Sequence, residues 1–181
     1  MFPKKEFYFI RHGQTDYNLL HAKVDHEDVS LNGTGVQQAL AVEGIIATLP
    51  IRSVCYSPLK RAKETKEIIS LRLLASHFEI PELGECSMEV WNEMRSCGAN
   101  AHQSAHKSVR AFMQRTVSGV NQALSRDGPI LIVAHGGIHW TMCCLMSVVD
   151  HEWTIANCLP VHFFPGSDGE WKANKILGNS L

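Results

Sequence analysis

Short apolar segments alternate along the chain with longer segments of helical periodicity. Glu6–Ile10 is rich in aromatic residues, and Ile130–Ala134 is apolar at every position, which is typical of strands covered on both faces. Val36–Leu49 carries apolar residues three and four positions apart, which predicts an amphipathic helix ended by Pro50. Further predicted elements are strands at Arg52–Tyr56 and Phe78–Ile80, helices from Ser57 to about Leu74, at Ser104–Leu124 and at Ile138–Val149, and a hairpin of Val161–Phe164 and Trp171–Lys175.

Strands that alternate with helices predict an α/β fold: a three-layer α/β/α sandwich around a mostly parallel central sheet. The chain has 181 residues, of which 45% are hydrophobic, so we expect residues 1–181 to form a single domain with a substantial core. The segment of about residues 81–103 shows no clear periodicity. We expect it to be irregular and to form a small, loop-rich lid that determines substrate specificity.

Charge and cysteine content exclude several classes of protein. Lys and Arg total 17 against 18 Asp and Glu, so the chain lacks the basic surplus of a nucleic-acid binder, and any anion site must be local. We expect no membrane segment, because the apolar runs are far shorter than the roughly 20 residues that span a bilayer. The six cysteines show no spacing typical of zinc sites, and the N-terminus resembles no secretory signal, which favours reduced thiols and a cytoplasmic location.

The most informative pattern is a buried strand that runs directly into a histidine, and it occurs twice. Glu6–Ile10 is followed by Arg11 and His12, and Ile130–Ala134 is followed by His135 and two glycines. Because the carboxyl ends of parallel strands meet at one edge of a sheet, we expect both imidazoles to lie in one cleft.

The neighbours of these histidines favour a tetrahedral oxyanion as the ligand. Arg11 precedes the first histidine, and Arg61 follows another predicted strand. Gly136 and Gly137 expose backbone N–H groups at a predicted helix start. Guanidinium groups and a helix N-terminus together suit a phosphate.

Four motifs in this order resemble those of the histidine phosphatase superfamily, also called phosphoglycerate mutase-like. Residues 11–18 read Arg-His-Gly-Gln-Thr-Asp-Tyr-Asn, which fits the family signature Arg-His-Gly-x-Ser/Thr-x-x-Asn. Residues 31–39, residues 57–65 and the Val-Ala-His-Gly-Gly of residues 133–137 resemble the later family segments. The resemblance extends from Phe7 to Val149 and implies the family fold.

The resemblance also implies a division of labour among the site residues. His12 would be the nucleophile that forms a phosphohistidine, and Arg11, Arg61 and a protonated His135 would hold the transferring oxygens. The family's general acid and base aligns with Glu85, although Glu89 stands where many relatives carry glycine, so Glu89 or Glu93 could take that role. Substrate-binding candidates are Asn18, Thr15, Gly136 and Trp91.

The sequence thus predicts a metal-independent phosphomonoester hydrolase without a cofactor, acting on a small phosphorylated metabolite or a phosphopeptide. The alternatives are a cofactor-dependent phosphoglycerate mutase, a phosphatase for protein phosphohistidine or phosphotyrosine, and an inactive scaffold that binds phospho-ligands. The short lid favours hydrolysis over mutase activity. The other eight histidines are given structural roles; they are His21, His26, His77, His102, His106, His139, His151 and His162. His139 lies four positions after His135, but a third metal ligand at a typical spacing is missing.

Overall fold

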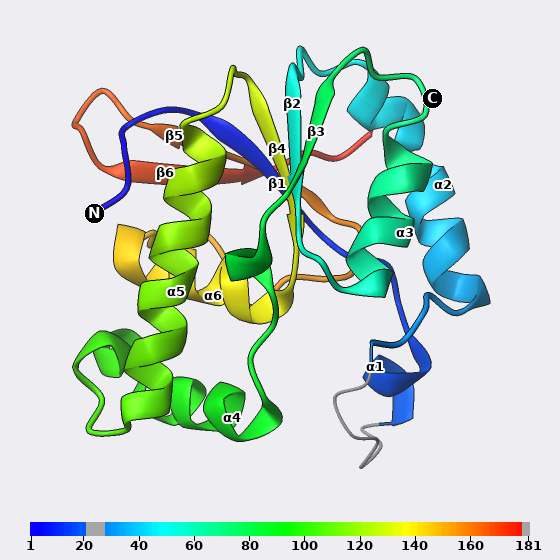
Figure 1. The fold of residues 1–181 in the computed structure, drawn as a ribbon. Helices are drawn as coiled ribbons and strands as arrows, with labels where there is room; N and C mark the ends of the chain where they lie inside the picture. Colours follow the sequence, from blue (N-terminus) through cyan, green and yellow to red (C-terminus); the bar gives the residue numbers. More distant parts are fainter. Residues whose placement is uncertain (21–27, 179–181) are drawn as a thin grey trace.

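The computed structural model describes residues 1–20 and 28–178, which form a six-stranded mixed sheet in the order β3-β2-β4-β1-β5-β6 (Figure 1). His21 and His26 lie outside these residues. The strands are β1 (Phe7–Arg11), β2 (Ser53–Tyr56), β3 (Ser76–Glu79), β4 (Ile130–Ala134), β5 (Pro160–Pro165) and β6 (Trp171–Lys175). β1, β2, β3 and β4 run parallel to one another, whereas β5 and β6 are antiparallel to their neighbours.

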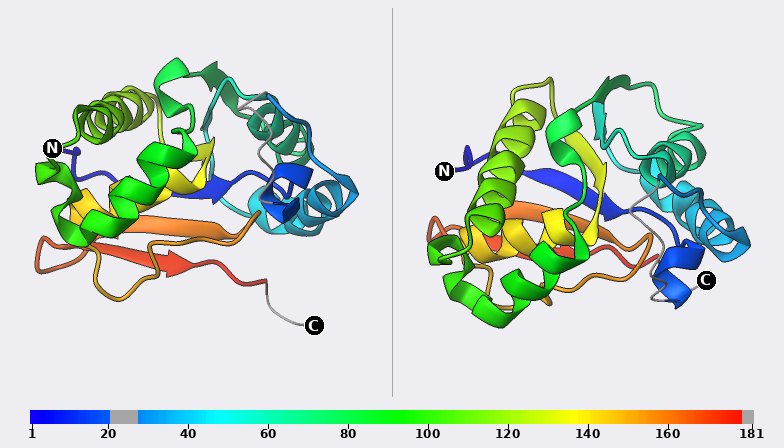
Figure 2. Two further views of the ribbon diagram at one scale, coloured as in Figure 1. Left: turned by 90° about the horizontal axis from the view of Figure 1, so that it is seen from below. Right: turned by 60° about the horizontal axis from the view of Figure 1, so that its bottom comes forward.

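Helices cover both faces of the sheet, which confirms the predicted α/β fold (Figures 1 and 2). α2 (Gly33–Ala47) and α3 (Lys60–Ile69) pack on one face, and α5 (Lys107–Leu124) and α6 (Gly136–Met146) pack on the other. The short helix α1 (Asp16–Leu20) follows β1. No helix in the described part of the chain is both long and apolar enough to cross a membrane.

The alternation of side chains along the central strands divides the core into two clusters. Phe7 and Phe9 of β1 join the cluster beneath α5 and α6, while Tyr8 and Ile10 join the cluster beneath α2 and α3. The side chains of β4 alternate between the two clusters in the same way, and all five residues of this strand are fully buried. Because both faces are covered, these strands need apolar residues at consecutive positions.

Segment 81–103 differs from the expected irregular loop. It contains a 3-10 helix η1 (Pro81–Leu83), the α-helix α4 (Met88–Cys97) and a second 3-10 helix η2 (Gly98–Gln103). The Ser87 hydroxyl caps α4 by accepting a hydrogen bond from the backbone N–H of Val90, 3.3 Å away. The expectation of a loop was wrong because this short helix follows a proline- and glycine-containing stretch that masks its amphipathic pattern.

The boundaries of several elements also differ from the sequence prediction. α2 begins at Gly33, where the Asn32 side chain caps the helix, and not at Val36. α3 spans Lys60–Ile69 rather than Ser57 to Leu74, and α5 begins at Lys107 rather than Ser104. α6 spans Gly136–Met146 rather than Ile138–Val149, and β3 spans Ser76–Glu79 rather than Phe78–Ile80. Apolar periodicity therefore located the buried middle of each helix better than its polar ends.

Candidate active site

Three neighbouring parallel strands end together at one edge of the sheet and deliver the polar residues there. The backbone N–H of His12 donates to the carbonyl of Ala134 across 3.0 Å, which continues the β1–β4 ladder. The N–H of Ser57 donates to Val133 in the same way from β2, also at 3.0 Å. The continued ladder fixes His12, Ser57 and His135 at the same edge of the sheet, where the sequence analysis expected the two histidines.

The hydrogen bond at Nδ1 sets the tautomer of His12. This side chain is only 2% exposed, and its Nδ1 lies 2.7 Å from the carbonyl oxygen of Gly13. Since a carbonyl can only accept, Nδ1 carries the proton and Nε2 keeps a lone pair. That Nε2 accepts a hydrogen bond from the Nε–H of Arg61, with the two nitrogens 3.3 Å apart. His12 therefore presents a neutral, nucleophilic nitrogen beside a guanidinium group.

His135 lies against His12 and is fully buried. The two ring centroids are 5.1 Å apart, and Nε2 of His135 lies 2.6 Å from the hydroxyl oxygen of Ser57. Nδ1 of His135 is buried and has no hydrogen-bond partner among the described residues. Such an unpaired atom is uncommon in a protein interior and is typical of a position that a ligand completes.

Burial and the neighbouring positive charges together keep both imidazoles neutral. Burial, followed by Arg61 and Arg11, holds the pKa of His12 well below its usual 6.5. Burial, followed by His12 and the nearby arginines, has the same effect on the pKa of His135. Without a ligand, the positive charge of this region therefore belongs to the guanidinium groups.

Arg11 and Arg61 are themselves largely buried, and burial lowers the pKa of each. The Glu85 carboxylate opposes this effect in both cases, which shows that the three groups share one electrostatic environment. Arg11 donates from Nη1 to the carbonyl of Ile155 at 2.8 Å, while its Nε is buried without a partner in the described part of the chain. Two buried cations facing one carboxylate leave a surplus of positive charge that suits an anion.

Glu85 reaches the first turn of α6 from the loop between η1 and α4. Its Oε2 accepts the backbone N–H of Gly137 at 3.0 Å, and its Oε1 accepts the N–H of Cys86 at 3.0 Å. Arg115 on α5 holds this loop by donating to the carbonyl of Glu85 at 3.2 Å. A Cβ atom on Gly137 would overlap Oε1 of Glu85, so glycine is needed there for close approach.

The two alternative carboxylates occupy other positions. Glu89 is exposed in the first turn of α4. Glu93, one turn further along, lies 3.1 Å from Nε2 of His106 and receives a 3.5 Å contact from the thiol of Cys97. Of the three carboxylates, Glu85 is the one whose contacts join it to the helix that follows His135.

The four residues expected to bind substrate differ in their contacts within the protein. The Thr15 hydroxyl is buried and donates to Oδ1 of Asn18 at 3.1 Å, and it also accepts from the Asn18 N–H in the manner of a helix N-cap. Oδ1 of Asn18 thus faces Thr15, which directs its amide N–H₂ group away. A Cβ on Gly136 would contact Arg11 at 3.7 Å, so this residue adjoins the site. Trp91 packs on the core with the Arg95 guanidinium 5.8 Å from its ring centre.

Four supporting residues were not among the expected site residues. Ser57 contacts His135, Asn157 donates to the carbonyl of His12 at 2.8 Å, and Thr65 accepts the N–H of Gly13 at 3.0 Å. Ser57 and Thr65 lie inside a motif that the sequence does reveal, at residues 57–65. Arg115 carries no such signal, because an arginine on an amphipathic helix looks like any solvated cation.

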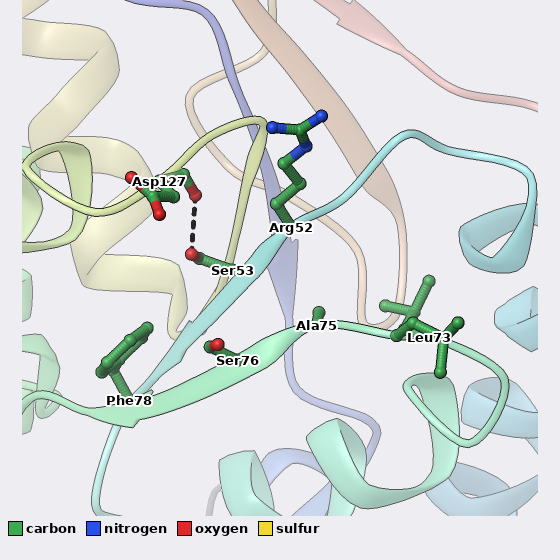
Figure 3. A pocket seen from close by; sticks show the side chains of 8 residues that line it. Arg52, Ser53, Leu73, Ala75, Ser76, Phe78 and Asp127 are labelled. Carbon is green, nitrogen blue, oxygen red and sulfur yellow. Dashed lines mark hydrogen bonds between the residues drawn. The ribbon is translucent and has the colours of Figure 1, made fainter.

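A separate pocket of about 680 Å³ lies at the opposite, amino-terminal edge of β2 and β3 (Figure 3). Residues that line it include Arg52, Ser53, Phe78 and Asp127. The Ser53 hydroxyl donates to the backbone carbonyl of Asp127 at 2.6 Å. None of the strand-end histidines lines this pocket, so we place the candidate active site elsewhere.

The sequence and the fold are similar to those of known phosphatases and mutase-like proteins. The chain is 41% identical over 155 residues to phosphoglycerate mutase-like protein 4 of Arabidopsis thaliana, covering 74% of this chain and 67% of that protein. It is 30% identical over 138 residues to the uncharacterized phosphatase PhoE of Bacillus subtilis, covering 70% of this chain and 69% of the relative.

Two further comparisons concern length and fold. The chain is 28% identical over 167 residues to an agropine synthesis reductase of Rhizobium rhizogenes; the match covers 80% of this chain but spans only 36% of that longer protein. The crystal structure of an Entamoeba histolytica phosphoserine phosphatase in complex with 3-phosphoglyceric acid shares the fold, with a TM-score of 0.71 and 19% identity, covering 96% of this chain and 98% of that one.

A family model agrees with the arrangement at the strand ends. It describes branch 1 of the histidine phosphatase superfamily and matches residues 7–159, which hold both strand-end histidines, both arginines and Glu85. The chain belongs to the histidine phosphatase superfamily, branch 1.

Proposed function

We propose that this protein hydrolyses phosphomonoesters through a phosphohistidine formed on His12. The observation that carries the proposal is the fixed tautomer of His12: Nδ1 is held by the Gly13 carbonyl, and the Nε2 lone pair lies beside Arg61. A neutral imidazole of this kind is a nucleophile that needs no base to activate it.

In the proposed first step, Nε2 of His12 bonds to phosphorus and the bond from phosphorus to the ester oxygen breaks. Arg11 and Arg61 stabilise the charge on the transferring oxygens. Glu85 enters this step as the neutral acid, gives its proton to the departing alcohol and becomes the carboxylate. In the second step Glu85 takes a proton from water, the water oxygen bonds to phosphorus, and His12 is released with inorganic phosphate.

His135 would change its charge state when substrate binds. Burial, together with His12 and the nearby arginines, lowers its pKa in the free site, and a bound phosphate dianion would offset the local positive charge and favour the imidazolium. Its unpaired Nδ1 would then donate to a phosphoryl oxygen. This expectation reconciles the neutral histidine of the free protein with the protonated one that the resemblance implies.

We propose a small phosphorylated metabolite as the substrate, with a phosphopeptide as the less favoured choice. The structural relative from Entamoeba histolytica was crystallised with 3-phosphoglyceric acid, which supports the first class. Asn18 and Gly136 would contact the phosphate, and Trp91 the remainder of the substrate. The six free cysteines favour a reducing compartment, and we propose the cytoplasm.

The first test is hydrolysis of p-nitrophenyl phosphate by the purified protein. The wild type should turn over, His12→Ala should lose activity by at least three orders of magnitude, and the exposed control His77→Ala should match the wild type. A rapid quench should trap an acid-labile, base-stable phosphoenzyme in the wild type alone. An inactive wild type would instead support a scaffold that binds phospho-ligands, and unchanged turnover by His12→Ala would exclude the proposed nucleophile.

A mutase is the second candidate, favoured by the 41% identity to a phosphoglycerate mutase-like protein. Both activities share the phosphohistidine and differ in its fate. We expect labelled phosphate from 3-phosphoglycerate to appear as free phosphate. Label retained on the sugar acid at a new position would establish the mutase instead.

The proposed reaction uses no metal ion, because two guanidinium groups supply the charge that a metal would otherwise provide. Prolonged dialysis against EDTA should therefore leave kcat for p-nitrophenyl phosphate unchanged. A loss of activity that Mg²⁺ or Zn²⁺ restores would contradict metal independence while leaving the phosphohistidine untouched.

A further inference from the structure

Three metal-ligating side chains converge behind the candidate active site. His139 and Cys143 lie one turn apart on α6, and His151 comes from the segment that follows this helix. Their ligand atoms all lie within 4.8 Å of one another. We call these three residues the His139 cluster. His139 and Cys143 are fully buried, and His151 is partly exposed.

The lone pair of His139 points into the cluster. Its Nδ1 lies 2.9 Å from the carbonyl oxygen of Trp153, so Nδ1 carries the proton and Nε2 offers a lone pair, which accepts a hydrogen bond from Nε2 of His151. Nε2 of His139 lies 3.0 Å from Nε2 of His151 and 3.8 Å from Sγ of Cys143. An N–H group held by a backbone carbonyl behind a ligating histidine is a usual second contact of protein metal sites.

The separations of these atoms are close to those of a tetrahedral zinc site, but the sulfur is not yet turned toward the shared position. With Zn–N near 2.1 Å and Zn–S near 2.3 Å, tetrahedral angles place two nitrogens about 3.4 Å apart and nitrogen and sulfur about 3.6 Å apart. Nε2 of His139 and Nε2 of His151 are 3.0 Å apart. Sγ of Cys143 lies 3.8 Å from Nε2 and 3.9 Å from Nδ1 of His139, so it faces the imidazole ring and has to rotate toward Nε2 to share an ion with the two histidines.

We propose that His139, Cys143 and His151 bind one Zn²⁺ ion, with the fourth position taken by water on the exposed side of His151. Two imidazoles and one thiolate select zinc and similar borderline or soft cations over Mg²⁺ or Ca²⁺, which prefer oxygen ligands. The ion takes no direct part in the proposed phosphoryl transfer and makes no contact with the substrate.

Binding must release one proton. The Cys143 thiol loses its proton when the Zn–S bond forms, and His151 remains neutral by moving its proton from Nε2 to Nδ1. Burial raises the pKa of the Cys143 thiol, so the ion competes with a firmly held proton. Affinity should therefore rise about tenfold for each pH unit between pH 6 and 8.

The ion would join α6 to a segment that supports the active site. This segment supplies His151 to the cluster, the Ile155 carbonyl to Arg11 and the Asn157 amide to the His12 carbonyl. A bond between its start and α6 should restrict its opening. Zinc should consequently raise the thermal midpoint of the protein, because it binds the folded state selectively.

The experiment is a titration of the purified, reduced protein of residues 1–181 with Zn²⁺ against a chromogenic chelator. We expect one ion per chain in the wild type and at least a hundredfold weaker binding in Cys143→Ser and in His151→Gln. His151→Gln alters a partly exposed side chain, so it should fold and still test the proposal if Cys143→Ser does not fold. Matched controls are Cys144→Ser, whose thiol contacts the Ala99 carbonyl at 3.6 Å, and His77→Ala on β3.

Cobalt supplies a readout that surface histidines cannot imitate. Co²⁺ bound at the His139 cluster should show an intense thiolate-to-cobalt charge-transfer band in the wild type and both controls, and no band in Cys143→Ser. Zinc binding that persists unchanged in Cys143→Ser and His151→Gln, or a wild type without a cobalt–thiolate band, would overturn the proposal.

Discussion

Nε2 of His135 lies 2.6 Å from the hydroxyl oxygen of Ser57, so the ends of β4 and β2 are joined by a buried polar contact. Ser57 also accepts the backbone N–H of Leu59 at 3.2 Å, which ties the start of α3 to the same hydroxyl. One serine therefore orients the imidazole of His135 and the loop that leads to Arg61. We regard it as a positioning residue of the site.

Replacing this serine tests that role. Ser57→Ala leaves a buried nitrogen of His135 without its partner, which should cost about 1–3 kcal/mol in the free energy of unfolding. We also expect a lower kcat for p-nitrophenyl phosphate with little change in KM. Urea denaturation and steady-state kinetics measure the two effects. Ser70→Ala is the control. Ser70 is likewise buried, but its hydroxyl donates to the carbonyl of Lys66 at 2.6 Å and does not contact the site. Equal effects of both variants on kcat and on the free energy of unfolding would contradict the special role of Ser57.

Gly137→Ala should separate the acid–base role of Glu85 from phosphate binding. The added methyl group would displace the Glu85 carboxylate, whereas Gly33→Ala, with open space around it, should change nothing. Because p-nitrophenolate leaves with little help from an acid, the loss should be greater for an alkyl phosphate, by about 10²-fold in kcat. An equal loss for both substrates would assign the effect to binding.

Arg61→Lys tests the guanidinium beside the nucleophile. Lysine keeps the charge but loses the Nε–H group that lies 3.3 Å from Nε2 of His12. We expect kcat for p-nitrophenyl phosphate to fall by about 10²–10³-fold, the effect of removing one oxyanion-stabilising donor. Arg52→Lys, at the opposite edge of the sheet, should retain wild-type kinetics. A loss of kcat of less than threefold would show that a positive charge at this position suffices for catalysis without the guanidinium geometry.

Stability should fall in mild acid because of buried histidines. Burial holds the pKa of His12 and His135 well below 6.5 and that of His139 at about 3, whereas the unfolded chain takes up protons near pH 6.5. The unfolded state therefore binds more protons, so stability is complete above about pH 6.5 and declines as the pH falls. Between pH 6 and 5 the loss should be about 1 kcal/mol for each histidine.

Urea denaturation at pH 7, 6 and 5 measures this decline. His135→Asn should remove about one third of the slope, because one of the three buried imidazoles is gone. A free energy of unfolding that stays level from pH 7 to pH 5 would contradict the neutral, buried state of these groups.

The strand-end residues could be predicted because sheet geometry is regular. Apolar runs located β1 and β4, and parallel strands necessarily bring the residues that follow them, His12 and His135, to one edge. The helix α4 was missed, because its stability rests on a cap at Ser87 and on packing rather than on a long periodic stretch.

Contacts set by distant segments were also beyond the reach of sequence patterns. No metal site was expected from the spacing of His135 and His139, yet in the structure His139 lies beside Cys143 and His151. His151 reaches the cluster only because the chain turns back after α6. Likewise, Asn157 reaches the carbonyl of His12 from the far end of the chain.

The position of β1 in the sheet has a consequence for the order of folding. Among the six strands of the sheet β1 is synthesised first, yet it lies between β4 and β5, whose residues are made more than a hundred positions later. Until β4 emerges from the ribosome, the strand that leads to His12 lacks both of its neighbours in the sheet. The growing chain must therefore keep an apolar strand unpaired until β4 has been made, and catalytic competence should appear only after β5 has joined the sheet.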